Sequence, residues 1–552
     1  MKGLDRRPEG RHRIAYGGHG RAQRWRASRR SAGMRRRERE QSRGVRSEDM
    51  HAMHQHVRRR VHLSSFVSGQ DALGLAQLHG KTLLREALGL TGTANNVGGN
   101  GGCDLHEMHN SMHPTHTQVP KDGRMFDTYL ECESPEQVAW ERLSAAPVSQ
   151  TWSHADEPEA ALHRIHAYPA KFPAFLTRRA MAYAAEHAVD VQMLGDVFCG
   201  CGTVAHEARR SGLAFWGCDI NPVAILIARA KSSPLKGDRL RALYAQVLER
   251  AGAMPLPARP VDVESFLRRW HSPEQYTALA QLLAAIEAVA SPRSTYRIAL
   301  LCAFSSILKA CSYWRAWSIK PRVDVDKAPR SPTKAFAAAC ARLARAYDDA
   351  QWPEGPAPQL HVADVRTVPA PVQRPDLLVC SAPYSTSVDY AELHQLSAAW
   401  LGHFPELARL RRATIGTRLA GARLPERHSQ LNRVGLQAVF ALYTQDPGAA
   451  SAIASYFVDM QQVARRCMDF LAPGGLAVFV VGNARLRGQT IDNAAHMTEA
   501  LLEAGFSRVR VARRKVSNKA TSPFRDMLGR LQREASDHVQ YNEEFVLIAH
   551  RP

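Results

Sequence analysis

The chain has 552 residues, of which 45% are hydrophobic, so it is long enough for more than one folded unit with a buried core. No apolar run is long enough to cross a membrane and the basic N-terminus lacks the apolar region of a secretory signal, so we expect a cytoplasmic protein without a membrane partner. The ten cysteines are scattered without a disulfide-like pattern, which is typical of a reducing compartment.

The net charge of +21 is unevenly distributed. Residues 1–60 hold 19 Arg or Lys against 6 Asp or Glu, a net charge of +13, whereas the other 492 residues hold 54 against 46, a net charge of +8. This excess of positive charge indicates a polyanionic partner such as nucleic acid. Most of the excess, however, lies outside the part of the chain that has the pattern of a folded enzyme.

Residues 1–124 are rich in Arg, His, Gly and Ser and show little sustained periodicity. We interpret them as a basic, disordered extension, and a nucleic-acid-binding tail is the alternative. His106, His109, His113 and His116 have ligand-like spacing, but they lie among Gly, Asn and Pro without a cysteine pair. No metal site is therefore expected there.

Residues 125–240 have the pattern of the first part of an α/β domain. Within residues 191–240 we expect, in order, a strand (VQMLGDVF), a tight turn (CGCG), a helix (TVAHEARRSG), a strand (LAFWGCD) and a helix (INPVAILIARAKS). This alternation predicts a βαβ unit, the opening of a doubly wound sheet.

Residues 241–350 have helical periodicity throughout and predict a helical insertion. Residues 351–552 return to strand–helix alternation, with strands expected at LHVAD, DLLVC, LAVFVVG, SRVRVARRKV and EEFVLIAH. One stretch of this second part, from Phe404 to about Asp446, is expected to be irregular and is rich in Arg. The sequence therefore predicts one α/β domain interrupted by a helical block.

A glycine-rich turn follows the first strand of the βαβ unit. Gly200 and Gly202 allow a tight turn and a close approach of the backbone to a ligand, and the following helix offers free N–H groups. Asp219 ends the next strand, where a carboxylate is placed to accept hydrogen bonds from ribose hydroxyls. Turn and acid together favour an adenosine-containing cofactor, and we interpret Cys199 and Cys201 as small space-filling residues.

Four motifs in order resemble those of the amino-methyltransferases that modify DNA bases with S-adenosylmethionine. They are His166–Phe172 (HAYPAKF), Asp196–Thr203 (DVFCGCGT), Gly217–Pro222 (GCDINP) and Ser381–Tyr384 (SAPY). The resemblance covers about residues 150–550. It implies a Rossmann-like methyltransferase fold, a mostly parallel seven-stranded sheet with an antiparallel last strand, carrying the helical insertion.

The resemblance also implies roles for individual residues. The methionine part of S-adenosylmethionine would be held by the Phe172 segment and the glycine turn, the ribose by Asp219, and the adenine by Asp364. The full set of cofactor-binding residues expected in this way is Lys171, Phe172, Asp196, Phe198, Gly200, Gly202, Thr203, Asp219, Asn221 and Asp364.

The expected catalytic residues are Ser381, Ala382, Pro383 and Tyr384. The Ser381 hydroxyl and the backbone carbonyl of Ala382 would accept hydrogen bonds from the target amine, and Tyr384 would stack on a flipped base. Ala382 stands where the family has proline, which costs rigidity on the order of 0.4–1 kcal/mol. We therefore expect reduced turnover, and we expect Ala382→Pro to raise it.

The resemblance implies a site-specific methyltransferase acting on double-stranded DNA, with cytosine N4 favoured over adenine N6 because serine opens the tetrapeptide. A partner restriction or defence system is a further expectation. Two alternatives stay open at this point: an RNA base methyltransferase with the same chemistry, and a catalytically weakened DNA-binding relative.

Three segments combine basic residues with a position that suits nucleic-acid contact. The first contains Trp314, Arg315, Trp317, Lys320 and Arg322, for which a helix with a tryptophan anchor and a solvated loop is the alternative. The other two are residues 409–433 and the loop that holds Arg513, Arg514, Lys515 and Lys519.

Overall fold

The computed structural model describes residues 128–155, 158–169, 171–318, 320–385, 389–416, 428–516, 524–525, 531–532 and 543–552. The basic extension 1–124 and its histidine cluster lie outside the described residues. None of the described helices is both long and apolar enough to cross a membrane.

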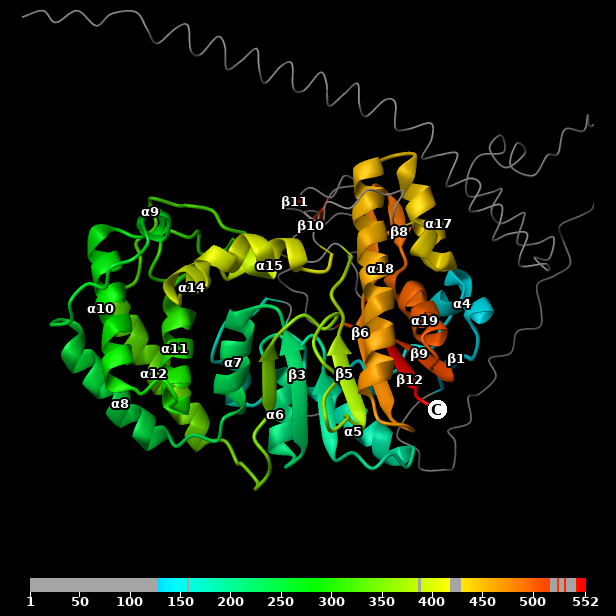
Figure 1. The fold of residues 1–552 in the computed structure, drawn as a ribbon, viewed down its shortest axis with the longest axis horizontal. Coiled ribbons are helices and arrows are strands. Elements are labelled where there is room, and N and C mark those ends of the chain that lie inside the picture. Colours follow the sequence, from blue (N-terminus) through cyan, green and yellow to red (C-terminus); the bar gives the residue numbers. More distant parts are fainter. Residues whose placement is uncertain are drawn as a thin grey trace, which may run out of the picture. The chain divides into compact units, whose positions relative to one another are not determined.

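An eight-stranded sheet forms the centre of the described chain, in the order β1-β9-β12-β6-β5-β2-β3-β4 (Figure 1). Its strands are β1 (Leu130–Cys132), β2 (Met193–Asp196), β3 (Ala214–Asp219), β4 (Gln359–Val362), β5 (Leu377–Ser381), β6 (Leu476–Val481), β9 (Arg508–Lys515) and β12 (Glu543–His550).

The direction of the strands confirms the Rossmann-like α/β fold. Strands β4, β3, β2, β5 and β6 are mutually parallel, and the last strand, β12, is antiparallel to both β6 and β9. These strands and β9 form the expected seven-stranded sheet. The short strand β1 adds an eighth at the edge, where it pairs antiparallel with β9.

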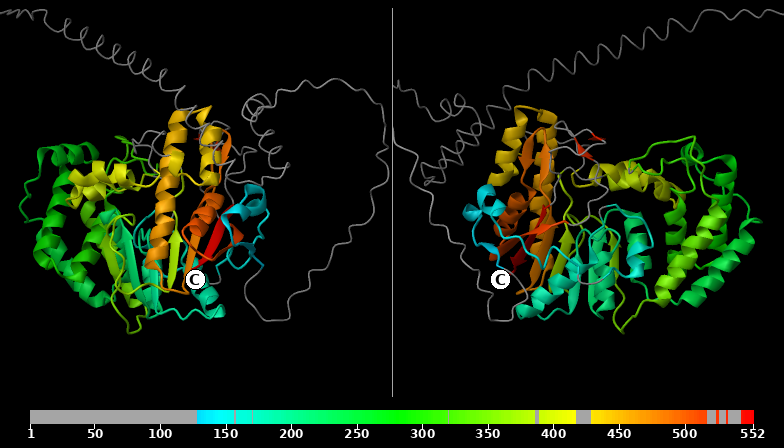
Figure 2. Two further views of the ribbon diagram at one scale, coloured as in Figure 1. Left: turned by 45° about the vertical axis from the view of Figure 1, so that its right-hand side comes forward. Right: turned by 180° about the vertical axis from the view of Figure 1, so that it is seen from behind.

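Helices cover both faces of the sheet (Figure 2). Because crossovers between parallel strands are right-handed, the connection from β2 to β3 and the one from β5 to β6 lie on opposite faces. The helices of the α/β part are α4 (Trp140–Ser144), α5 (Ala174–Glu186), α6 (Thr203–Arg210), α7 (Pro222–Ser232), α13 (Tyr390–Leu393), α14 (Gln395–Trp400), α15 (Leu407–Ala413), α17 (Arg433–Tyr443), α18 (Pro447–Phe470) and α19 (Asn493–Glu503).

Short elements complete the α/β part. These are the 3₁₀ turns η1 (Pro135–Gln137), η2 (Ala161–Arg164), η3 (Phe404–Glu406) and η4 (His428–Gln430), the hairpin of β7 (Ala484–Leu486) with β8 (Gln489–Ile491), and the pair β10 (Phe524–Arg525) with β11 (Leu531–Gln532).

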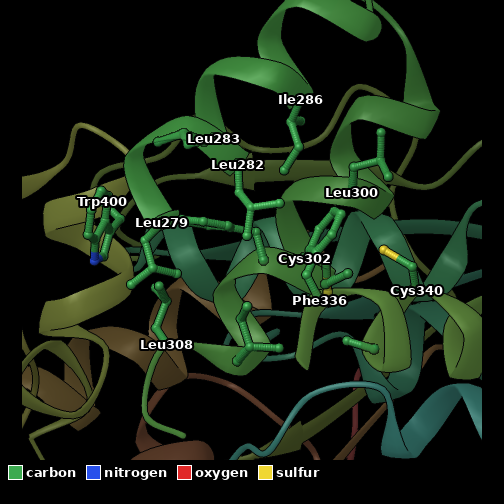
Figure 3. Packing of buried hydrophobic residues seen from close by; sticks show 14 of the residues in the cluster. Leu279, Leu282, Leu283, Ile286, Leu300, Cys302, Leu308, Phe336, Cys340 and Trp400 are labelled. Carbon is green, nitrogen blue, oxygen red and sulfur yellow. The ribbon is translucent and has the colours of Figure 1, made fainter. Parts of the chain in front are cut away.

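Five consecutive helices form the helical block, whose core is shown in Figure 3. They are α8 (Gly237–Ala251), α9 (Val261–Trp270), α10 (Pro273–Val289), α11 (Thr295–Ile307) and α12 (Pro332–Asp348). Leu279, Phe304 and Phe336 are fully buried within it. Trp400 of α14 packs into the same core, so a residue from beyond the block completes it. The division of the chain at residues 240 and 350 stays a prediction.

The expectation of an irregular stretch from Phe404 to Asp446 is wrong for its described residues. Helix α15 lies within it, and α17 begins at the N-cap Asn432, whose side chain accepts a hydrogen bond from the Gly435 amide. Helix α15 is short and rich in arginine, and Leu410 is its one buried residue, so its apolar period is hard to see in the sequence.

Gly202 links the glycine turn to the packing of the sheet. It adopts the left-handed conformation, with φ of 73°, at the N-cap of α6. A Cβ built on it would lie 2.5 Å from the Cβ of Ala228 on α7. Glycine is therefore required here both by the backbone conformation and by the contact of α6 with α7.

We expect Gly202→Ala to lower the free energy of unfolding by about 2–4 kcal/mol, from left-handed strain and overpacking. Urea unfolding followed by circular dichroism measures this. Gly252→Ala is the matched control, because Gly252 has right-handed φ and ψ and a Cβ built on it would meet no described atom within 4 Å. Equal stability of the two variants would contradict the packing role of Gly202.

Candidate active site

A cavity of about 470 Å³ opens at the carboxyl edge of the parallel strands, where ligands bind in doubly wound sheets. It brings together all the sequence-predicted site residues except Gly202. Those that line it are Lys171, Phe172, Asp196, Phe198, Gly200, Thr203, Asp219, Asn221, Asp364, Ser381, Ala382, Pro383 and Tyr384.

Asp219 holds the glycine turn against the end of β3. Its Oδ2 accepts a hydrogen bond from the Gly200 amide at 2.9 Å, and its Oδ1 accepts one from the Asn221 amide at 2.8 Å. Each carboxylate oxygen keeps a further lone pair for a ligand hydroxyl. Burial raises the pKa of Asp219 to about 6, against the effect of the two amides.

Asp196 ends β2 and shapes the start of the turn. Its Oδ1 accepts a hydrogen bond from the Phe198 amide at 2.9 Å. Burial, with a smaller contribution from the neighbouring charge of Asp219, raises its pKa to about 8, against the effect of the Phe198 amide. Of the two buried carboxyls, Asp196 holds its proton more strongly, so Asp219 is the one that ionises first as the pH rises.

Lys171 lines the cavity, but its ammonium is bound within the protein. Its Nζ pairs with Oε2 of Glu159 at 2.5 Å and donates to the His163 carbonyl at 3.1 Å. Phe172 lines the cavity beside it. The geometry thus offers the Phe172 ring to a ligand, while the charge of Lys171 is already neutralised by Glu159.

Asp364 lies in the loop after β4, at the same edge. Its carboxylate is bound by Arg366, with Nη2 to Oδ2 at 2.6 Å, and Arg366 also pairs with Asp459 at 3.0 Å. The backbone amide and the Nε of Arg366 also donate to this carboxylate, so each of its oxygens accepts two hydrogen bonds and its orientation is fixed. Its assignment to adenine stays a prediction.

The tetrapeptide leaves β5 and presents two hydrogen-bond acceptors. Ser381 is the last residue of β5 and lies opposite Val480 of β6. The hydroxyl of Tyr456 donates to the Pro383 carbonyl at 2.8 Å. Within the described residues, by contrast, neither Ser381 Oγ nor the Ala382 carbonyl has a hydrogen-bond partner. These two acceptors are therefore available to a ligand in the cavity.

The backbone amide of Ala382 corrects one expectation from the sequence. It donates a hydrogen bond to the Val480 carbonyl at 3.2 Å, which continues the β5–β6 ladder by one residue. Proline at this position would lose that bond, at a cost of about 0.5–1.5 kcal/mol. The loss is as large as the entropic gain of about 0.4–1 kcal/mol, so an increase in turnover from Ala382→Pro is no longer expected.

Tyr384 is fixed from both sides. Its hydroxyl donates to Oε1 of Glu544 on β12 at 2.8 Å, and a Cβ built on Gly482 would lie 2.9 Å from its ring. Glu544 in turn forms an ion pair with Arg514, its partner in register on β9. The ring therefore has one defined orientation at the wall of the cavity.

Sequence reasoning assigned no role to several other residues of the cavity wall. Tyr168 and Tyr390 stack at a centroid distance of 5.5 Å, and His394 Nδ1 accepts a hydrogen bond from Asn221 Nδ2 at 2.9 Å. Glu544 also lines the cavity, whereas His394 contacts Asn221 from outside the lining. For Glu544, the one signal in the sequence is that two glutamates begin an otherwise apolar strand, EEFVLIAH.

The three basic segments differ in their surroundings. In residues 409–433, Arg411 pairs with Asp389, and residues 417–427 lie outside the described residues. In the C-terminal segment, Arg514 is buried against Glu544, and Lys519 is not described. In the first segment, Trp314 is a buried anchor, as the alternative interpretation had it.

One buried group among the described residues has the residue types of a metal site: His163, His206 and Glu207. Glu207 Oε1 accepts a hydrogen bond from His163 Nε2 at 2.9 Å, and its Oε2 accepts one from Arg178 at 3.0 Å. Because an imidazole and a guanidinium already bind this carboxylate, we interpret the group as an internal polar cluster.

We expect Glu544→Gln to lower the free energy of unfolding by about 3–5 kcal/mol, because it leaves Arg514, whose side chain is 4% exposed, without its counter-charge. Chemical denaturation measures this. The exposed pair of Glu264 with Arg268 gives the matched control, and Glu264→Gln is expected to cost less than about 1 kcal/mol. Equal costs for the two substitutions would contradict a buried, structural ion pair.

No model of a known protein family matches this chain. A segment of 78 residues, 14% of the chain, is 32% identical to the type II methyltransferase M.MvaI of Kocuria varians. This match spans 17% of the relative's own length.

Two solved structures of the rRNA methyltransferase aviRa from Streptomyces viridochromogenes align with 72% of this chain and 96% of their own, at 12% identity. Their TM-scores are 0.25 and 0.24, so the fold assignment depends on the strand order described above. The sequence similarity to M.MvaI is local, because it covers 14% of this chain.

Proposed function

We propose that this protein is a methyltransferase that uses S-adenosylmethionine to methylate the exocyclic amine of a base in double-stranded DNA. One observation carries the proposal. Ser381 and Ala382, whose hydroxyl and backbone carbonyl have no hydrogen-bond partner among the described residues, line the same cavity as Gly200 and Asp219. The local similarity to a type II methyltransferase supports it independently.

The donors and acceptors of the cavity fit the proposed cofactor. When bound, S-adenosylmethionine would supply an electrophilic methyl group. Asp219 offers free lone pairs to the ribose hydroxyls, and Gly200 lets the backbone approach closely. Phe172 offers an apolar surface to the methionine part, and Asp364 would accept from the adenine amine. The volume of about 470 Å³ lies in the usual range for sites of small ligands and cofactors.

The tetrapeptide would activate the target amine by position and hydrogen bonding. An exocyclic amine is a weak nucleophile, because its lone pair is delocalised into the ring. If Ser381 Oγ and the Ala382 carbonyl accept its two N–H groups, the nitrogen is held with its lone pair out of the plane of the base. The residues thus orient the amine toward the cofactor side of the cavity.

Tyr384 would hold the target base by stacking. A base inside a duplex cannot reach a buried cavity, so the nucleotide must leave the helix. Stacking on an aromatic ring contributes roughly 1–3 kcal/mol per base. The hydrogen bond to Glu544 fixes the ring before the base arrives, which reduces the entropy lost on binding.

Cytosine is the favoured target, on the serine that opens the tetrapeptide, and adenine is the second choice. An RNA base methyltransferase and a DNA-binding protein without turnover are the competing functions. A partner restriction or defence system stays a prediction.

We expect the purified full-length chain to transfer labelled methyl groups to unmodified duplex DNA, with N4-methylcytosine found by nucleoside analysis. Ser381→Ala removes one acceptor and should lower kcat about 10- to 100-fold. Ser455→Ala is the matched control, because its hydroxyl is buried on α18 and has no hydrogen-bond partner among the described residues. Label on RNA alone would contradict the DNA substrate, and cofactor binding without any transfer would favour the DNA-binding alternative.

We expect the affinity for S-adenosylmethionine to fall as the pH drops below about 6, the pKa to which burial raises Asp219. Below that pKa the protonated carboxyl loses part of its capacity to accept hydrogen bonds from the ribose. Isothermal titration calorimetry between pH 5 and 8 measures this. Asp219→Asn should bind more weakly and lose this part of the pH dependence, and an unchanged pH profile in that variant would contradict the role of Asp219.

A further inference from the structure

Apolar side chains are unusually exposed in the loop between α11 and α12, residues 309–330, which we name the α11–α12 loop. Trp317 is 76% exposed, Val325 73% and Val323 46%. Across the described residues, eight large hydrophobic side chains are exposed, and these three fall within nine consecutive positions. Three large apolar side chains exposed so close together in the chain make this loop a candidate interaction site.

The backbone of the loop is held firmly where it leaves the helical block. Trp314 is buried and packs on Trp270 of α9 at a centroid distance of 5.4 Å. The ammonium of Lys327 donates to the carbonyls of Lys309 and Trp314, both at 2.7 Å. Trp317 is therefore exposed on a loop whose neighbouring residues, Trp314 and Lys327, are fixed by packing and by hydrogen bonds.

Hydrogen bonds across the loop bring its two sides together. The Arg315 amide donates to the Arg322 carbonyl at 2.8 Å, and the Asp324 amide donates to the Tyr313 carbonyl at 2.7 Å. Trp317 lies within the segment that these hydrogen bonds enclose. Its side chain is thus presented to solvent by a closed, hydrogen-bonded turn.

The charge of the loop is strongly positive. It holds six Lys or Arg against two Asp, a formal net charge of +4. The guanidinium of Arg315 lies 5.2 Å from the centre of the Trp317 ring, and its Nε lies 3.4 Å from Asp324. Lys320 and Arg322 are exposed, and their side chains have no ion-pair partner within the described part of the chain. The loop therefore carries, near the exposed indole of Trp317, two cationic side chains that no described carboxylate neutralises.

The fold places this loop at the end of the helical block that faces the same way as the cavity. Helix α12 ends at Asp348, whose carboxylate binds the Gly237 amide at the start of α8. That start lies at the amino edge of the sheet, because α7 runs back there from the end of β3. Since α12 has 17 residues, its other end, and with it the loop, lies about 25 Å away toward the carboxyl edge.

Contacts within the block agree with this placement. The loop packs on the end of α9, and α9 contacts α14, which follows the tetrapeptide and α13 in the chain. In the view of Figure 1, α9, α14 and α15 lie in the upper part of the described chain, and the label of α8 lies below them. The loop and the mouth of the cavity therefore belong to the same side of the sheet.

We infer that the α11–α12 loop binds duplex DNA beside the nucleotide whose base enters the cavity. This inference rests on the proposed function and adds the contact surface. Lys320 and Arg322 contact backbone phosphates, and Trp317 stacks on a base or sugar where the duplex is distorted by the departure of the target nucleotide. Positive charge around the apolar cluster favours a polyanionic partner over a protein surface.

The test measures DNA binding by the full-length chain separately from methyl transfer. The probe is a fluorescein-labelled 30-base-pair duplex, titrated by anisotropy at several salt concentrations. Trp317→Ala should raise Kd about 5- to 100-fold. Lys320→Ala with Arg322→Ala should raise Kd and lower the slope of log K against log salt by about 2, because two phosphate contacts are lost.

Control variants outside the loop distinguish a specific role of the loop in DNA binding from general effects of net charge and of stability. Lys236 and Arg239 are exposed at the start of α8, by the amino edge, and their double alanine variant should keep both Kd and salt slope close to the native values. Trp140→Ala removes another exposed tryptophan and should leave DNA binding unchanged. S-adenosylmethionine affinity should be native in all variants, which shows that they are folded.

Three results would overturn the inference. Native DNA affinity in both loop variants would assign the apolar cluster to a protein partner, while methylation of DNA by the same samples would leave the proposed function intact. Equal losses in the amino-edge control would show that only net charge matters. With a labelled RNA duplex of the same length as a second probe, weaker RNA binding and unchanged DNA binding in the loop variants would assign the loop to RNA.

Discussion

The pairing of β2 with β5 is the interaction on which the cavity depends. Leu194 lies opposite Leu377, and Gly195 lies opposite Leu378, although more than 180 residues separate the two strands in the chain. A Cβ at Gly195 would lie 2.5 Å from the Leu378 side chain, so glycine permits this close approach. Because the strands are parallel and adjacent, the glycine turn and the tetrapeptide leave the sheet at the same edge. The chain between β2 and β5, which includes the helical block, is therefore a long connection between two adjacent strands.

Features encoded locally could be predicted from the sequence. Strands β2 and β5 are short runs of buried apolar residues, and each ends in a turn that only a few residue types can form. Asp219 was predicted as a site residue because its position at the end of β3 is visible in the sequence. The structure places it in the cavity and binds it to the Gly200 amide. The helices of the block were predicted for the same reason, since each carries its own period.

Features that depend on distant pairing could not be predicted. Glu544 reaches Tyr384 because β12 inserts between β6 and β9, and nothing near Glu544 in the sequence indicates that order. The amide of Ala382 is bound to Val480, which became apparent only once β6 was placed beside β5. Alanine at this position is thus a ladder residue as well as a substitution within a family motif. Its effect on rigidity is smaller than the motif alone suggests, because the hydrogen bond restores part of what proline would supply.

The shared core of the helical block and α14 has a mechanical consequence. Trp400 is buried among helices of the block (Figure 3). Its indole nitrogen donates a hydrogen bond to His271 at the end of α9. The segment just before Trp400 carries Tyr390 and His394. Tyr390 lines the cavity, and His394 accepts a hydrogen bond from Asn221, which also lines it. The helical block is therefore joined to the cavity wall through Trp400 and the short segment that carries it. The cavity wall and the core of the insertion thus share one segment of the chain, so a substitution in that core also removes support from the wall.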